Sequence, residues 1–165
     1  MLEKCVPDAV FGSLTDITPE FLRARGVRDV LVDLDNTLGV RHPSTPTPEA
    51  EAWIECLRGN GFRVVVLSNA RNPARAAAFC ELLGLPHIAR AGKPRRGGFL
   101  QAARALNRAP GELVMVGDQI FTDMLGARRS GVQAFWVRPV ALDSLFVRLR
   151  HELEKPFLRK RGWRG

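Results

Sequence analysis

Two aspartates, Asp33 and Asp35, stand two residues apart at the end of an apolar run that begins at Val30. Alternate residues of an extended chain point the same way, so both carboxylates are expected to face one crevice where the strand ends. Two like charges placed this close together repel, which favours a bound cation or a shared reaction. The alternative is a strand that ends in two solvated aspartates.

Three more polar residues, Ser68, Lys93 and Asp118, follow later predicted strands directly or nearly so. In an open parallel sheet the carboxyl ends of the strands line one crevice, so these side chains are expected to converge with Asp33. A group of carboxylates binds an anion poorly until a hard cation neutralises it. Mg²⁺ is the natural candidate, because it keeps positions for water and phosphate oxygens.

Such a site has the groups that phosphoryl transfer needs. A carboxylate can attack phosphorus to give an acyl phosphate, which water later hydrolyses. A second acid can protonate the leaving oxygen and then activate the water. The hydroxyl of Ser68 and the ammonium of Lys93 can hold the charge that spreads over the transferred group.

The elements that position these residues alternate along the chain. We expect strands from Val30 and at 62–67, 86–90, 113–116 and 133–137, with helices near 18–26, 47–59, 72–84, 99–106 and 122–129. The segment before Thr18 has no regular pattern, and the proline-rich segment 39–47 predicts a loop or tight flap. Strands that are apolar throughout predict an α/β fold of three layers, a Rossmann-like parallel sheet with helices on both faces.

Length and composition predict one domain over residues 1–165, with a basic tail at about 155–165. No apolar run approaches the roughly 20 residues that span a bilayer, and no signal peptide is evident, so we expect a cytoplasmic protein. The three scattered cysteines predict reduced thiols. A net charge of +8 would attract anionic partners, whether phosphorylated metabolites, nucleic acid or anionic lipid head groups, and does not choose between them.

Four short motifs carry a resemblance. Asp33-x-Asp35-x-Thr37, Ser68-Asn69, Lys93-Pro94, and Gly117-Asp118 followed by Asp123 resemble, in this order, the motifs of the haloacid dehalogenase (HAD) superfamily. In having an acid at position 35, the chain resembles the phosphatases of that superfamily. It differs there from the dehalogenases and the P-type ATPases.

The resemblance implies a role for each matched residue. Asp33 would be the phospho-accepting nucleophile and Asp35 the general acid and base. Mg²⁺ would be held by the Asp33 carboxylate, the Asp35 backbone carbonyl and Asp118. Phosphate-binding and supporting roles would fall to the remaining motif residues, Ser68, Asn69, Lys93, Thr37 and Asp123.

A narrower resemblance is to the YqeG-like branch, whose relatives include phosphatidylglycerophosphate phosphatase. It rests on residues 35–38 and 116–123, and Ala70 departs from it where a second asparagine is expected. Only about 30 residues separate the first motif from Ser68, and about 25 separate Ser68 from Lys93, lengths that a loop and one helix already use. No cap domain is therefore expected, and an open site suits a large or surface-presented phosphomonoester, of which a lipid phosphate is one.

The C-terminal segment combines an apolar stripe with a basic end. The stripe recurs at helical spacing and comprises Leu142, Leu145, Phe146, Leu149 and Leu153. We expect it to pack on the sheet. For the last residues, which include Phe157, Leu158 and Trp163, two interpretations stay open: an anchor on a membrane surface or a solvated tail.

The sequence therefore predicts a Mg²⁺-dependent phosphomonoester hydrolase, with phosphatidylglycerophosphate as the first substrate to test. The alternatives are a phosphatase for a soluble sugar, nucleotide or phosphoprotein, and a non-catalytic basic domain that binds RNA or membrane. The presence of both carboxylates counts against the last, so a nucleic-acid partner is not expected. Arg71, Arg95 and Arg96 flank two of the motifs and are candidates to contact substrate phosphate.

Overall fold

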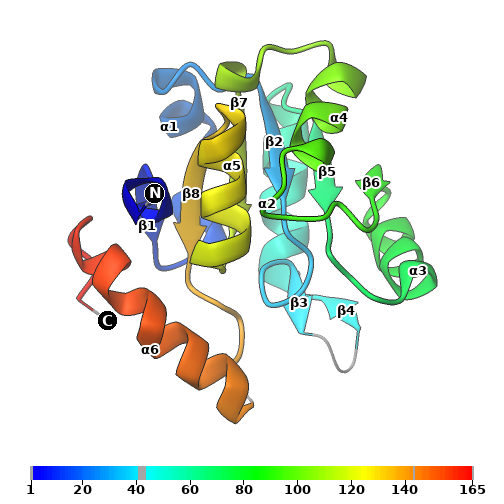
Figure 1. Ribbon diagram of the computed structural model, residues 1–165. Helices are drawn as coiled ribbons and strands as arrows, with labels where there is room; N and C mark the ends of the chain where they lie inside the picture. The colour runs from blue at the N-terminus through cyan, green and yellow to red at the C-terminus, as the bar shows by residue number, and fades with distance from the viewer. Residues whose placement is uncertain (1, 41–43, 143, 165) are drawn as a thin grey trace.

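The computed structural model describes residues 2–40, 44–142 and 144–164, without the side chains of Leu2 and Phe146. A central sheet of six parallel strands has the order β1-β8-β7-β2-β5-β6 (Figure 1). Its strands are β1 Ala9–Phe11, β2 Asp29–Val32, β5 Val64–Leu67, β6 His87–Ile88, β7 Leu113–Gly117 and β8 Gln133–Val137. A small antiparallel hairpin pairs β3 Gly39–Val40 with β4 Thr45–Pro46.

Helices follow most of the strands. They are α1 Pro19–Ala24, α2 Pro48–Gly59, α3 Pro73–Leu83, α4 Gly97–Leu106, α5 Leu125–Ser130 and α6 Leu145–Arg159. The first three begin alike: Thr18, Thr47 and Asn72 each accept a hydrogen bond from a backbone N–H of the first turn, and proline follows the cap. Proline is favoured there because its missing N–H has no partner to lose. The cap signals in the sequence therefore predict these three helix starts correctly.

Alternate residues of each central strand enter two separate cores. In β2, Val30 and Val32 pack with helices α1, α2 and α3, whereas Leu31 packs with α4 and α5. All four residues of β2 are buried, as are all four of β5. Burial on both sides explains why these strands are apolar apart from Asp29, whose buried carboxylate pairs with Arg63 and Arg108. The predicted three-layer α/β architecture is confirmed.

Two elements differ from the sequence-based expectation. The N-terminal stretch expected to be irregular contains β1, which pairs with β8 at the edge of the sheet. Three half-buried residues give too short a pattern to predict a strand. The helix expected at 122–129 begins as a π-helical turn, Ile120–Met124, and continues as α5.

The segments between the motifs are short. The chain from β2 to β5 holds the β3–β4 hairpin and α2, and the chain from β5 to β6 holds α3. No inserted cap domain occurs in the part of the chain that the structure describes. Helix α6 lies beyond β8, toward the end of the sheet where the strand arrows point (Figure 1).

The expected packing of the C-terminal stripe is wrong for three of its residues. Leu145, Leu149 and Leu153 are exposed, and α6 instead buries Glu154 and Leu158 on its other side. The side chain of Phe146, a further member of the stripe, lies outside the described residues. Among the residues that the structure describes, no helix has both the length and the apolar character needed to cross a bilayer.

Candidate active site

Three neighbouring strands deliver the first polar residues of the site. Asp33 follows β2, Ser68 follows β5 and Asp118 follows β7, and β2 lies between the other two strands. Asp33 donates its backbone N–H to the carbonyl of Val116 in β7, at 2.9 Å. The indole of Trp136 in β8 donates to the carbonyl of Asp118 at 2.7 Å. Parallel strands therefore bring these side chains to one edge of the sheet, as predicted.

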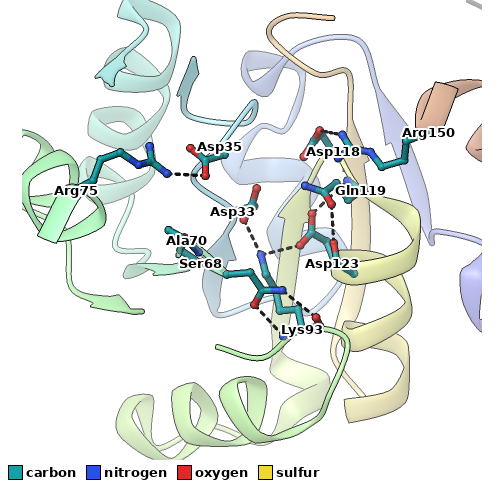
Figure 2. Close-up of polar contacts among 12 residues, drawn as sticks. Asp33, Asp35, Ser68, Ala70, Arg75, Lys93, Asp118, Gln119, Asp123 and Arg150 are labelled. Atoms are coloured by element: carbon teal, nitrogen blue, oxygen red, sulfur yellow. Dashed lines mark hydrogen bonds and ion pairs between the residues drawn. The ribbon is translucent and has the colours of Figure 1, made fainter. Parts of the chain in front are cut away.

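Lys93 links two of the acids (Figure 2). Its ammonium lies 2.6 Å from Oδ1 of Asp33 and 2.7 Å from Oδ1 of Asp123, and only 2% of the side chain is exposed. Asn69 holds the Lys93 backbone in place: its amide donates to the Lys93 carbonyl at 2.8 Å and accepts from the Lys93 N–H at 2.9 Å. Two segments that are 24 residues apart are thus fixed to each other beside the acids.

The buried acids form a group that fits a hard cation. Oxygens of Asp33, Asp118 and Asp123 lie within 4.8 Å of one another. Oδ2 of Asp33 and Oδ1 of Asp118 are buried and have no hydrogen-bond partner among the described residues. Unpaired buried carboxylate oxygens are costly, and an oxygen-preferring divalent ion satisfies them.

Burial and charge shift the ionisation of this group. Burial raises the pKa of Asp33 to about 7, with Lys93 opposing the rise and Asp123 adding to it. Burial also raises the pKa of Asp118 well above its ordinary value, helped by the neighbouring carboxylates. Burial disfavours the ammonium of Lys93, but Asp123 and Asp33 outweigh this effect and raise its pKa. Lys93 therefore remains charged, whereas Asp33 and Asp118 bind protons more readily than ordinary aspartates.

Asp35 lies apart from the group formed by Asp33, Asp118 and Asp123. Its Oδ2 pairs with the guanidinium of Arg75 at 2.7 Å, while its Oδ1 has no partner in the described structure. The sequence-based expectation assigns the backbone carbonyl of Asp35 to the metal, so its side chain is available for another task. Thr37, expected to support the site, is buried two residues further on.

Ser68 is buried at the base of the cleft and accepts a hydrogen bond from the N–H of Ala70 at 3.0 Å. The cleft has a volume of about 590 Å³. It is lined by Asp33, Asp35, Asn36, Ser68, Asn69, Ala70, Arg71, Lys93, Gln119, Thr122, Ser144, Val147 and Arg150. Arg71 thus lies at the cleft, whereas Arg95 and Arg96 are exposed and are not among its lining residues.

Sequence reasoning missed two arginines at the site. Arg75, in the first turns of α3, contacts Asp35, and Arg150 of α6 lies 3.1 Å from Oδ2 of Asp118. One turn further along α6, Glu154 accepts a hydrogen bond from the N–H of Ile120 at 3.0 Å. Arg75 follows the Ser68-Asn69 motif closely, which could have suggested it. No local pattern links α6 to a strand end 32 residues earlier.

Gly117 provides a sharp test of this geometry. A Cβ at this position would come within 2.4 Å of Oδ2 of Asp123, far inside van der Waals contact. Gly117→Ala should therefore displace the Asp123 carboxylate from Lys93 and lower kcat at least about tenfold. Gly59→Ala, where a Cβ meets no atom within 4 Å, is the matched control and should keep full activity. Equal activity of both variants would contradict the placement of Asp123.

A parallel sheet that gathers aspartates, a hydroxyl and a lysine at its carboxyl edge places the chain in the Rossmann-like α/β class. Residues 9–131 match the haloacid dehalogenase-like hydrolases, and the chain belongs to this family. A Bacillus subtilis protein described as "Probable phosphatase YqeG" is 36% identical over 160 residues, which cover 96% of this chain and 92% of that protein. The chain is a phosphatase of this family.

Two further comparisons concern a lipid enzyme and the fold. Phosphatidylglycerophosphate phosphatase 1, chloroplastic, of Chlamydomonas reinhardtii is 30% identical over 127 residues, covering 72% of this chain and 47% of that protein. The chain thus spans about half the length of that relative. The crystal structure of a hydrolase from Pseudomonas syringae superposes with a TM-score of 0.58 at 15% identity, covering 78% of this chain and 98% of the other. This likeness supports the fold alone.

Proposed function

We propose that this phosphatase hydrolyses phosphomonoesters through an aspartyl-phosphate on Asp33, with Mg²⁺ as cofactor. The observation that carries the proposal is the buried contact of Lys93 with Asp33 and Asp123. It leaves Oδ2 of Asp33 unpartnered at a cleft of about 590 Å³. A carboxylate oriented through one oxygen and free at the other is suited to attack phosphorus.

In the first half of the reaction, Oδ2 of Asp33 attacks the phosphorus atom and the ester P–O bond breaks. Asp35 gives a proton to the leaving alcohol. The Arg75 guanidinium holds the Asp35 carboxyl in position at 2.7 Å. The side chains of Lys93 and Ser68 hold the negative charge on the phosphoryl oxygens as it develops.

In the second half, Asp35 takes a proton from a water molecule that attacks phosphorus. The bond between phosphorus and Asp33 breaks, inorganic phosphate leaves, and Asp33 returns to a carboxylate. The same residue thus acts first as acid and then as base.

Asp33 and Asp118 are the carboxylates that would hold Mg²⁺, together with the backbone carbonyl of Asp35. Asp123 would steady this set through Lys93 and through the N–H of Gln119, from which it accepts a hydrogen bond at 3.2 Å. Mg²⁺ would neutralise the acids and attract the phosphate oxygens. The unpartnered Oδ1 of Asp118 supports this assignment.

Phosphatidylglycerophosphate is the substrate that we propose first. A relative bearing that activity in its name matches 72% of this chain. No inserted cap domain covers the cleft in the described residues, so a phosphomonoester on a large or membrane-borne molecule can reach Asp33. The net charge of +8 favours an anionic surface. A basic C-terminal segment that touches the membrane is part of the same proposal.

The test is a phosphate-release screen in Mg²⁺ that sets vesicle-borne phosphatidylglycerophosphate beside soluble sugar, nucleotide and peptide phosphates. We expect turnover of a generic aryl phosphate and the highest kcat/KM for the lipid. A higher kcat/KM for a soluble phosphate would overturn the lipid assignment and leave the phosphatase chemistry in place. Failure to release phosphate from any of them would overturn the proposed reaction.

Metal binding should appear in thermal stability and depend on pH. The pKa of Asp33 is raised to about 7 from 3.8, so without metal the ionised carboxylate lowers folding stability as pH rises from about 4 to about 7. Mg²⁺ binds the ionised form, so it should raise Tm by several degrees at about pH 8 and by much less at about pH 5. Calorimetry checks this. Asp118→Asn should remove most of the shift, and an equal shift at both pH values would contradict the metal assignment.

A further inference from the structure

One side of α6 fixes the helix to the body of the protein. Leu158 is fully buried, and Phe157 packs edge-to-face on Phe121 with 5.6 Å between ring centroids. Glu154 is 1% exposed and accepts a hydrogen bond from the N–H of Ile120, in the turn that follows Asp118. Helix α6 is thus tied to the motif that carries the acids, and its opposite side has a defined orientation.

That opposite side presents a strip of exposed leucines. Leu145, Leu149 and Leu153 are 82%, 60% and 61% exposed, and their four-residue spacing places them in one row along the helix. Soluble surfaces carry single exposed leucines without consequence, but a row of three on one helix marks a contact surface. We call Leu145, Leu149 and Leu153 the leucine strip.

The leucine strip lies alongside the cleft. Ser144, Val147 and Arg150, from the start of α6 and the residue before it, line the cleft that Asp33 faces. Helix α6 runs past the end of the sheet to which the strands point (Figure 1). Arg150 reaches Asp118 from the same helix (Figure 2). A surface that receives the leucine strip would therefore stand next to the entrance of the site.

The charges around the leucine strip are mainly positive. Arg148, Arg159 and Lys160 are exposed on or directly after α6, and Arg161 continues the series. The exposed acid Glu152 is paired with Lys155 within the helix. Apolar residues on one side of a helix with basic residues beside them are typical of helices that lie in the head-group region of an anionic bilayer.

A second copy of the chain fits this surface poorly. Standard interfaces use roughly 20–30 residues on each side, whereas the leucine strip has three. Two strips packed together would also bring the basic residues of both copies close to each other, and each copy carries a net charge of +8. An anionic lipid surface instead complements both the leucines and the charge.

We propose that the leucine strip inserts into the head-group region of an anionic membrane and holds the cleft at the bilayer surface. The inference rests on the proposed phosphatase function and adds to it the surface on which a lipid phosphomonoester is presented. Leu145, Leu149 and Leu153 take no part in the chemistry, so vesicle binding and turnover of a soluble substrate are separable.

The experiment compares three full-length proteins by vesicle co-sedimentation. They are the wild type, the triple variant Leu145→Ser, Leu149→Ser and Leu153→Ser, and the control Leu82→Ser. Leu82 is 66% exposed on α3 and is therefore a matched leucine outside the strip. Each is mixed with vesicles of phosphatidylglycerol and phosphatidylcholine, or of phosphatidylcholine alone. Turnover of an aryl phosphate and of vesicle-borne phosphatidylglycerophosphate is measured in parallel.

We expect the wild type and Leu82→Ser to sediment with the anionic vesicles, and the triple variant to bind them at least about tenfold more weakly. The triple variant should hydrolyse the aryl phosphate like the wild type and lose at least about tenfold toward the vesicle-borne lipid. Equal binding by the triple variant and the wild type, or no vesicle binding by the wild type, would overturn the inference. A dimer that depends on the leucines, seen by sedimentation velocity without vesicle binding, would assign the strip to a second copy instead. Absence of aryl phosphate turnover by the wild type would contradict the proposed reaction. Vesicle binding tests the leucine strip and does not test that reaction.

Discussion

Asp33→Asn is expected to lower turnover of a generic aryl phosphate by at least about 10³-fold, because an amide cannot serve as the nucleophile. The substitution keeps the size of the side chain, so Lys93 retains its place beside residue 33. It also removes one of the like charges that raise the pKa of Asp118. The variant should therefore fold with a metal-free Tm at about pH 8 that equals or exceeds that of the wild type.

The matched control is Glu81→Gln, which neutralises an exposed acid on α3. It should keep full activity, so that a loss in Asp33→Asn cannot be ascribed to a changed net charge. Steady-state kinetics and a thermal melt of both variants suffice. Undiminished turnover by Asp33→Asn would remove Asp33 from the role of nucleophile.

Lys93→Ala is expected to affect both turnover and stability. Removal of a phosphate-binding donor should lower kcat by about 10²–10³-fold. It also leaves Asp33 and Asp123 buried without their shared cation, and breaking a buried pair in this way costs about 3–5 kcal/mol of unfolding free energy. The loss in metal-free protein should be larger at about pH 8 than at about pH 5, where the raised pKa of Asp33 allows it to take up a proton.

Two variants separate this effect from a general loss of lysine charge. Lys160→Ala, at an exposed position, should change neither stability nor kcat. The double variant Asp33→Asn with Lys93→Ala should regain part of the stability lost by Lys93→Ala alone, because one of the two unpaired carboxylates is gone. Urea denaturation at the two pH values measures this. Additive losses in the double variant would show that Lys93 and Asp33 do not interact.

Much of the site could be predicted because its residues stand directly after strands. Side chains at the carboxyl ends of parallel strands meet at one edge, so Asp33, Ser68 and Asp118 could be placed together from local patterns. The helix starts could be predicted for a similar reason, since cap and proline signals act within a few residues. The fold class followed from strands that are apolar on both sides.

The rest depends on contacts between distant segments. Arg75 and Arg150 reach the acids from α3 and α6, and helix periodicity alone does not say which side of a helix meets the sheet. In α6 three leucines of the predicted stripe are exposed, and the buried side carries Glu154 as well as Leu158. Burial raises the pKa of Glu154 to about 7. A hydrogen bond from the N–H of Ile120 offsets part of the cost of burying Glu154. A pattern of apolar residues could not reveal this contact.

The most direct test of the central claim is to trap the phosphorylated enzyme. Asp35→Asn should still accept a phosphoryl group from an aryl phosphate, whose leaving group needs little protonation, but should hydrolyse the acyl phosphate slowly. Acid quenching after incubation with a radiolabelled aryl phosphate and Mg²⁺, followed by peptide mapping, should place the label on the peptide that contains Asp33. Label on another residue, or release of phosphate with no label on the protein at any time, would contradict the account.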